Sequence, residues 1–258
     1  MVRLGYMTNA FGALVGDGGG VTSMKDVHYW TVGDNEDLIK KVATHGYKYI
    51  EIFEGNILAY ENEPEVFLNL LSKYGVELLG VYVGCHFIYE DALEDELYKV
   101  DKVARIAKSL GAIHIVLGGG SIRANGIREG DYKLLAAGID KAAAIVKSYG
   151  LIPSYHPHLG SLAEKPEQIE KLFSLTDIAF CPDIAHLQAG GSDAVAMVKK
   201  YHNRIPYIHL KDLSEDKTFM PLGRGIIDIA EIISFMQDAG YKGDWLVEVD
   251  GYPGSPDE

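Results

Sequence analysis

The sequence lacks most features of secreted, membrane-spanning and nucleic-acid-binding proteins. Its 258 residues include two cysteines, Cys85 and Cys181, too few for a disulfide scaffold, which favours a reducing, cytoplasmic compartment. No apolar run approaches the roughly 20 residues that span a bilayer, and the first residues show no signal-peptide pattern. With 24 Lys and Arg against 37 Asp and Glu, the net charge of −13 repels phosphate backbones. We therefore expect neither a membrane nor a nucleic acid as a partner.

The glycine-rich motifs that bind phosphate groups are also missing. Neither GxGxxG nor GxxxxGK[ST] occurs, which disfavours a nucleotide-binding open sheet. The three glycines at 118–120 lack the spacing that opens a phosphate-binding helix, and they predict a tight turn near a ligand. No linker rich in Pro or Ser divides the chain, so we expect a single domain over residues 1–258.

Short apolar segments alternate with segments of helical periodicity along the whole chain. The predicted strands cover residues 3–8, 47–53, 76–83, 112–117, 151–156, 178–182, 205–210 and 244–249. The predicted helices between them cover residues 35–45, 65–74, 97–110, 132–149, 166–173, 194–202 and 228–239. A glycine in front of several of these strands is typical of a left-handed helix end. Eight strands that alternate with helices predict a (β/α)8 TIM barrel, and a doubly wound open sheet is the alternative.

Four consecutive predicted strands end in residues that can bind a metal ion. In chain order these residues are His156, Asp183, His209 and Glu248. Active-site residues of such barrels lie at the C-terminal ends of strands about 4.8 Å apart, so these side chains can converge. Two imidazoles and two carboxylates suit a divalent ion, although any one of these residues alone could be an ordinary turn residue.

Three further residues point to the same end of the predicted barrel. Strand alternation places His158 on the face of His156, and Lys211 on the face of His209. His186 follows the sixth strand. The alternatives are that His186 only caps the next loop and that Lys211 forms a solvated pair with its neighbour Asp212.

Other polar side chains near strand ends are candidate substrate contacts. These are Glu54, His86, Tyr155 and Arg224. The alternatives are polar groups that satisfy loop backbone for Glu54 and His86, core packing for Tyr155, and a solvated loop residue for Arg224. Residues 12–30 form a long glycine-rich segment after the first strand, which predicts a loop that covers the barrel mouth as a lid.

Several segments resemble the xylose isomerase-like TIM-barrel superfamily, and within it the inosose (2-keto-myo-inositol) dehydratases. The similar segments are YHPHLGS (155–161), PDIAHLQAGGSD (182–193), RIPYIHLKD (204–212) and PLGRGIID (221–228), and the likeness is sharpest over 155–248. The resemblance implies a metal ion held by Asp183, His209 and Glu248. It also implies a substrate contact at His186 and places Lys211 beside the bound sugar.

The chain departs from the epimerases of this superfamily on the fifth strand. They carry a Glu there, whereas this chain has His156 and then His158. A metal-bound imidazole is a poor proton carrier, so Glu248 is the remaining member of the family's pair of bases. A single base favours a reaction in which one proton is removed next to a ketone and hydroxide departs with help from an acid. The candidates for this acid are His186, His158 and Lys211.

The resemblance therefore implies a lyase of the inosose dehydratase kind, acting on a keto-sugar or cyclitol. It implies one divalent ion, Mn²⁺ first, with Co²⁺, Zn²⁺, Fe²⁺ or Mg²⁺ as alternatives. The other possibilities are a sugar (phosphate) isomerase or epimerase, the catalytic subunit of a C-glycoside-cleaving enzyme with a small partner chain, and a non-catalytic metal-binding barrel. A homo-oligomer, dimer or tetramer, is compatible with the family. The net charge of −13 argues against the DNA-cleaving branch.

Overall fold

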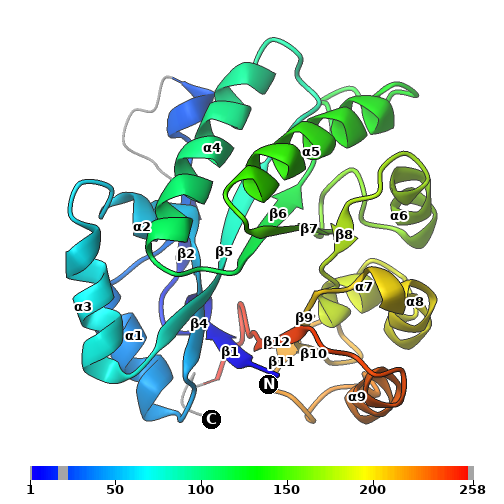
Figure 1. Cartoon of the computed structure of the whole chain (residues 1–258). Helices are drawn as coiled ribbons and strands as arrows, with labels where there is room; N and C mark the ends of the chain where they lie inside the picture. Colours follow the sequence, from blue (N-terminus) through cyan, green and yellow to red (C-terminus); the bar gives the residue numbers. More distant parts are fainter. Residues whose placement is uncertain (1, 17–22, 255–258) are drawn as a thin grey trace.

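The computed structural model describes residues 2–16 and 23–254, and its centre is a parallel sheet rolled into a barrel (Figure 1). The order of the strands around the sheet is β8-β7-β6-β5-β4-β1-β12-β9. In chain order they are β1 Leu4–Met7, β4 Tyr49–Phe53, β5 Glu77–Cys85, β6 His114–Gly119, β7 Ile152–His156, β8 Ala179–Phe180, β9 Tyr207–Leu210 and β12 Asp244–Val247. The (β/α)8 barrel predicted from the sequence is confirmed.

The barrel closes at the ends of β8 and β9 rather than along their length. The bridge there joins Asp183 to His209, and the His209 amide donates a hydrogen bond to the Pro182 carbonyl at 2.9 Å. Two residues that the sequence marked as metal ligands therefore lie directly opposite each other where the barrel closes.

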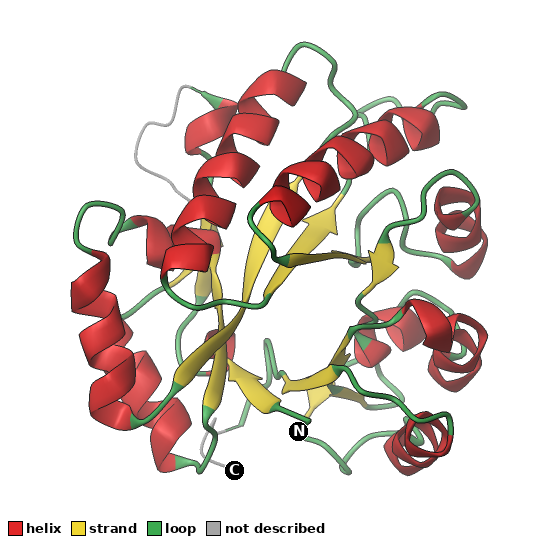
Figure 2. Ribbon diagram, in the orientation of Figure 1, coloured by secondary structure: helices red, strands yellow, loops and turns green. Residues whose placement is uncertain are grey.

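Helices cover the outside of the barrel, as Figure 2 shows. They are α1 Asn35–Thr44, α2 Glu54–Leu58, α3 Pro64–Tyr74, α4 Leu93–Ser109, α5 Asp131–Ser148, α6 Pro166–Phe173, α7 Ile184–Ala189, α8 Ala194–Tyr201 and α9 Ile229–Asp238. Short 3₁₀ turns cover Thr8–Ala10, Met24–Asp26 and His202–Arg204. No described helix is both long and apolar enough to cross a membrane.

The glycines in front of the strands adopt the conformation that the sequence predicts. Gly75 ends α3 with φ +65°, and its amide bonds to carbonyls of the last helical turn. Positive φ values also occur at the corresponding positions 46, 111, 150 and 240. A side chain at these positions would strain the backbone, so glycine sets where each helix stops and the next strand begins.

Two apolar cores lie on opposite sides of the sheet. The larger one lies between strands and helices. The smaller one fills the barrel interior with Met7, Phe53, Leu79, Val116, Cys181, Tyr207 and Leu246. Side chains alternate along a strand, so the next inward position after Tyr207 is His209, and after Leu246 it is Glu248. These apolar side chains therefore pack beneath the polar strand ends.

Two short hairpins stand at the C-terminal end of the barrel. Strands β2 (Leu14–Gly16) and β3 (Tyr29–Thr31) pair antiparallel within the segment that the sequence predicts as a loop. That prediction is wrong for these strands, because their pairing satisfies their backbone groups, and residues 17–22 of the segment lie outside the described residues. The second hairpin joins β10 (Asp212–Leu213) to β11 (Phe219–Met220).

Candidate active site

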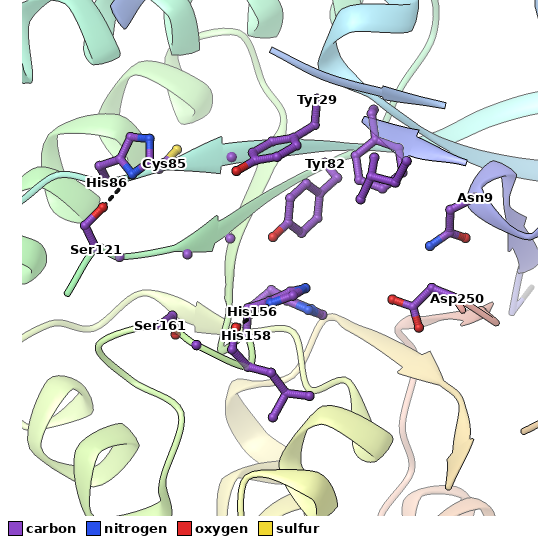
Figure 3. Close-up of a pocket in the computed structure, with 18 of the residues that line it drawn as sticks. Asn9, Tyr29, Tyr82, Cys85, His86, Ser121, His156, His158, Ser161 and Asp250 are labelled. Atoms are coloured by element: carbon purple, nitrogen blue, oxygen red, sulfur yellow. Dashed lines mark hydrogen bonds between the residues drawn. The ribbon is translucent and has the colours of Figure 1, made fainter. Parts of the chain in front are cut away.

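A cavity of about 420 Å³ opens at the C-terminal ends of the strands (Figure 3). One part of its wall is apolar or aromatic and includes Met7, Leu14, Phe53, Tyr29 and Tyr82. The polar side chains that line the cavity are Asn9, His86, Ser121, His156, His158, Ser161, Glu248 and Asp250. Such a combination of apolar surface and a few convergent polar groups is typical of a small-molecule site.

Three of the predicted ligands lie together beside this cavity, and of these Glu248 lines it. Asp183, His209 and Glu248 each present a ligand atom within 4.8 Å of the other two, and all three residues are buried. Glu248 Oε2 lies 3.0 Å from His209 Nδ1. We refer to these three residues as the carboxylate–histidine cluster.

The Lys211 side chain is fully buried against this cluster. Its Nζ lies 2.8 Å from Asp183 Oδ2, 3.1 Å from Glu248 Oε1 and 2.9 Å from Asp250 Oδ1. Three carboxylates thus surround one ammonium group, which leaves a formal excess of two negative charges. A divalent cation would neutralise that excess.

The close charges shift the ionisation of both partners. Burial alone would raise the pKa of Glu248, but Lys211 and His209 outweigh it and hold that pKa well below its ordinary value. Burial likewise opposes a charge on Lys211, yet Asp183 and the other carboxylates raise its pKa above the usual range. Glu248 and Lys211 are therefore both charged at neutral pH.

The carboxylate–histidine cluster fits a divalent metal ion. Asp183 Oδ1 caps α7 by accepting hydrogen bonds from the amides of Ala185 and His186, each at 2.9 Å. This leaves Oδ2 free of any hydrogen bond of normal geometry from the described residues, although Lys211 lies close to it. A buried oxygen, a second carboxylate and an imidazole form a donor set suited to Mn²⁺, Co²⁺, Zn²⁺ or Fe²⁺.

His156, the fourth predicted ligand, lies at the border of this cluster. It forms one candidate ligand group with Cys181 and His209, and another with His158 and His186. Its ring centroid is 5.1 Å from that of His209 and 5.4 Å from that of His186. The structure therefore places it beside the three other predicted ligands rather than among them.

The histidines at this edge of the cavity are held close to one another. The rings of His158 and His186 meet edge to face with centroids 4.2 Å apart, and His186 Nε2 lies 3.3 Å from Lys211 Nζ. Burial, and then the neighbouring His186, lower the pKa of His158 to about 4. Burial also lowers the pKa of His156 well below its ordinary value. His156 and His158 are consequently neutral near pH 7.

The predicted substrate contact His86 does line the cavity. Its Nδ1 lies 2.6 Å from Ser121 Oγ (Figure 3). The buried carboxylate of Glu96 accepts hydrogen bonds from the backbone amides of His86 and Phe87. Phe87 has φ +58°, a strained value for an aromatic residue, so Glu96 stabilises an unusual turn that presents His86 to the cavity.

The other three predicted substrate contacts do not line the cavity. Tyr155 packs against Phe173 in the outer core and donates its hydroxyl to the Gly119 carbonyl. Glu54 is fully buried behind the cavity, where it accepts hydrogen bonds from the amides of Tyr29 and Gly84, and burial raises its pKa to about 7. Arg224 lies in the loop after β11.

The expectation of a solvated pair between Lys211 and Asp212 is wrong. Asp212 is fully buried, and its carboxylate accepts hydrogen bonds from the amides of Gly223, Gly225 and Ile227. These bonds fix the loop after the second hairpin, while Lys211 points to the other side of the strand.

Sequence reasoning missed several residues of the site. Asn9 donates a hydrogen bond to Glu248 Oε1 at 3.0 Å, and Asp250 binds Lys211. Asp250 follows Glu248 by two residues, and Asn9 follows the first strand, so strand alternation and strand ends could have found both. Tyr29 and Tyr82 carry no comparable signal in the sequence.

Gly118 at the end of β6 makes room for one wall of the cavity. A β-carbon at this position would overlap with the hydroxyl of Tyr82. We expect Gly118→Ala to displace the Tyr82 ring and to lower the free energy of unfolding by about 1–3 kcal/mol, as overpacking does. Urea unfolding measures this. Gly130→Ala is the control, because a β-carbon there meets no atom within 4 Å, and an equal loss in both variants would contradict the argument.

The sequence matches one described family over most of its length. Residues 39–258 match the family described as xylose isomerase-like TIM barrel. An inosose dehydratase of Clostridium perfringens (strain 13 / Type A) is 28% identical over an alignment of 266 positions, gaps included, that covers 87% of this chain and 88% of that protein.

Solved structures show the same fold at low sequence identity. The probable 3-DHS dehydratase AsbF of Bacillus anthracis superposes with a TM-score of 0.75 at 15% identity, over 99% of this chain and 95% of that one. The IOLI protein, solved with a zinc atom bound, superposes with a TM-score of 0.73 at 17% identity, over 98% of this chain and 90% of that one.

Proposed function

Because this chain belongs to the xylose isomerase-like TIM barrel family, we propose that it is a divalent-metal-dependent lyase resembling inosose dehydratase. It would act on a keto-sugar or cyclitol by removing a proton next to the carbonyl. The observation that carries this proposal is the carboxylate–histidine cluster with its buried Lys211, which adjoins the cavity through Glu248. The excess of negative charge there would hold a divalent ion.

Asp183, His209 and Glu248 would hold the ion, with His156 as the nearest candidate for a fourth ligand. Mn²⁺ is our first choice, and Co²⁺, Zn²⁺, Fe²⁺ or Mg²⁺ are the alternatives. When bound, the ion polarises the substrate ketone and stabilises the negative charge that develops on its oxygen. Asn9 and Lys211 keep the Glu248 carboxylate in place for this role.

Elimination of water needs one base and one acid beside the substrate. The base takes the proton from the carbon next to the ketone. The C–H electrons then form a double bond, the C–O bond on the neighbouring carbon breaks, and hydroxide leaves as water with a proton from the acid. The candidates for the base are Glu248 and His158. The candidates for the acid are His186, which lies close to Lys211, and Lys211 itself.

The rest of the cavity would hold the hydroxyl groups and the ring of the substrate. His86 with Ser121 offers a polar edge at one end, and Asn9 with Asp250 offers one at the other (Figure 3). Tyr82 and Tyr29 would cover one face of a sugar or cyclitol ring and exclude water. We propose that Glu54 supports this wall indirectly, through its hydrogen bond to the Tyr29 amide.

An isomerase or epimerase is the second candidate function. The observation that favours it is the presence of two proton carriers at the cavity, Glu248 and His158, because inversion at a carbon needs one carrier for each face. Cleavage of a C-glycoside with a partner chain, and metal binding without catalysis, complete the alternatives.

Proton exchange in ²H₂O distinguishes these functions. With Mn²⁺ present, we expect 2-keto-myo-inositol to lose water, and the ¹H NMR signal of the proton on the carbon next to the ketone to disappear. Exchange without loss of water would indicate an isomerase or epimerase. A protein that binds metal but catalyses no exchange with any ketose or inosose would contradict the proposal.

Two variants identify the base in the same experiment. Both Glu248→Gln and His158→Gln keep the size of the side chain, and metal content is checked first. The variant that loses exchange by about 10²–10⁴-fold while its metal is retained has lost the general base. Normal turnover in Glu248→Gln would remove Glu248 from that role.

A further inference from the structure

The inside of the barrel contains a fully buried carboxylate, Glu51, which is in neither of the candidate ligand groups around His156 nor in the carboxylate–histidine cluster. It lies on β4 between Tyr49 and Phe53, whose side chains contribute to the inner core. Gly80 on the neighbouring strand leaves room for it, because a β-carbon there would lie 2.5 Å from Glu51 Oε2. The barrel interior is therefore shaped around this carboxylate.

Within the described part of the chain, neither oxygen of Glu51 has a hydrogen bond of normal geometry. A buried carboxylate without a partner strongly disfavours the folded state, so such a group needs a specific neighbour. One neighbour is His209, whose Nε2 lies 3.4 Å from Glu51 Oε1, and another is the buried hydroxyl of Tyr207. The ring nitrogen also has no hydrogen bond of normal geometry among the described residues, so the two unsatisfied atoms face each other.

The His209 ring thus lies between two carboxylates, one in the barrel interior and one beside the cavity. Nε2 faces Glu51 in the barrel interior, and Nδ1 lies 3.0 Å from Glu248 Oε2 in the carboxylate–histidine cluster. Cys181, Tyr207 and His156 are its other close polar neighbours, and none of them carries the negative charge of a carboxylate at neutral pH, while a thiol is only a weak hydrogen-bond acceptor. Glu51 is the strongest acceptor on the Nε2 side.

We propose that Glu51 is a positioning residue for His209. It accepts the Nε2 proton and thereby keeps the lone pair of Nδ1 directed at the place where Asp183 and Glu248 would share a metal ion. A neutral imidazole carries one N–H, and the hydrogen bond of one nitrogen decides which nitrogen is left to bind a metal. The inference rests on the metal site of the proposed function, and it adds a residue that touches neither metal nor substrate.

Metal affinity is the direct test. Glu51→Gln keeps the size of the side chain but removes the charge and can present an amide N–H to Nε2, which favours the wrong tautomer. We expect Mn²⁺ and Zn²⁺ to bind about 10–100-fold more weakly, as loss of such partners does elsewhere. Competition of the metal-free protein with a chromophoric chelator for each metal measures the dissociation constants.

Glu54→Gln is the matched control. Glu54 is equally buried and lies three residues further along the chain, but its partners are the amides of Tyr29 and Gly84 together with Lys99. We expect both variants to lose thermal stability, whereas only Glu51→Gln should lose metal affinity. Equal metal affinity of wild type and folded Glu51→Gln would overturn the inference and leave Glu51 a purely structural residue.

A second variant keeps the inference testable if Glu51→Gln does not fold. Glu51→Asp retains the charge but shortens the side chain by one methylene and so moves the carboxylate further from Nε2. We expect a smaller loss of affinity than with Gln, and unchanged affinity in this variant would also count against the positioning role. If the wild-type protein itself binds no divalent ion, the proposed function fails first. If the wild type binds metal and the Glu51 variants bind it equally well, only the present inference fails.

Discussion

Asp183→Asn is expected to weaken binding of a divalent ion by at least about 100-fold and to abolish the activity of the loaded protein. Asn keeps an oxygen that can cap α7 through the amides of Ala185 and His186, so the helix should still form. It replaces Oδ2, which lacks a hydrogen bond of normal geometry, by an amide nitrogen that cannot bind a cation. The variant therefore separates the metal-binding role of this residue from its structural role.

Asp193→Asn is the matched control for this experiment. Asp193 caps α8 by accepting a hydrogen bond from the Ala196 amide, and it lies outside the cavity lining. Isothermal titration with Mn²⁺ should give the same affinity for Asp193→Asn as for the wild type. If Asp183→Asn also retained its affinity, the carboxylate–histidine cluster would not be the metal site, and the group of His156, His158 and His186 would become the leading candidate.

The barrel could be predicted from the sequence because its signals are local. Glycine at the end of a helix and an apolar strand after it depend on a few neighbouring residues, and they recur along the whole chain. The strand ends could be read for the same reason, since His156, His209 and Glu248 each continue the inward-facing side of a strand.

Elements defined by tertiary contacts gave no such signal. Helix α7 has six residues, too few to show a helical period, and its start depends on the Asp183 carboxylate. The β2–β3 hairpin joins segments that contain glycines and few β-branched residues. Tyr155 lies next to His156 in sequence but packs in the outer core on the other side of the sheet, which neighbourhood in the chain alone did not indicate.

The charge arrangement around Lys211 was also beyond the reach of the sequence. The motif HLKD presents two charged residues side by side, and a solvated pair was a reasonable interpretation. In the folded chain they point to opposite sides of the strand and are both fully buried, each among its own partners. The partners of a buried charge come from strands far away in the sequence, which meet only when the barrel closes.

Lys211→Met is expected to lower the free energy of unfolding of the metal-free protein by about 3–5 kcal/mol, the usual effect of removing one partner of a buried ion pair. Asp183, Glu248 and Asp250 would remain close together without the ammonium group that separates them. Urea unfolding in the presence of a chelator at pH 8 measures the loss. Unchanged stability of the variant would mean that the three carboxylates are not charged together.

The loss should shrink as the pH falls. In the wild type, Lys211 outweighs burial and lowers the pKa of Glu248 and of Asp250, so these groups stabilise the fold above their ordinary pKa of about 4 and lose that contribution below it. In the variant, burial and mutual repulsion raise both pKa values, so protonation favours the folded state. Wild type and variant should therefore converge in stability towards pH 4.

Added metal provides the last distinction between a structural lysine and one that shares the site with an ion. A divalent cation would be the remaining counter-charge in Lys211→Met, so saturating Mn²⁺ should raise the stability of this variant more than that of the wild type. Lys99→Met is the control, because Lys99 is also buried but donates to the carbonyls of Val27 and Gly84. Mn²⁺ should stabilise Lys99→Met only as much as it stabilises the wild type. An extra stabilisation confined to Lys211→Met would show that ammonium and metal ion balance the same group of carboxylates.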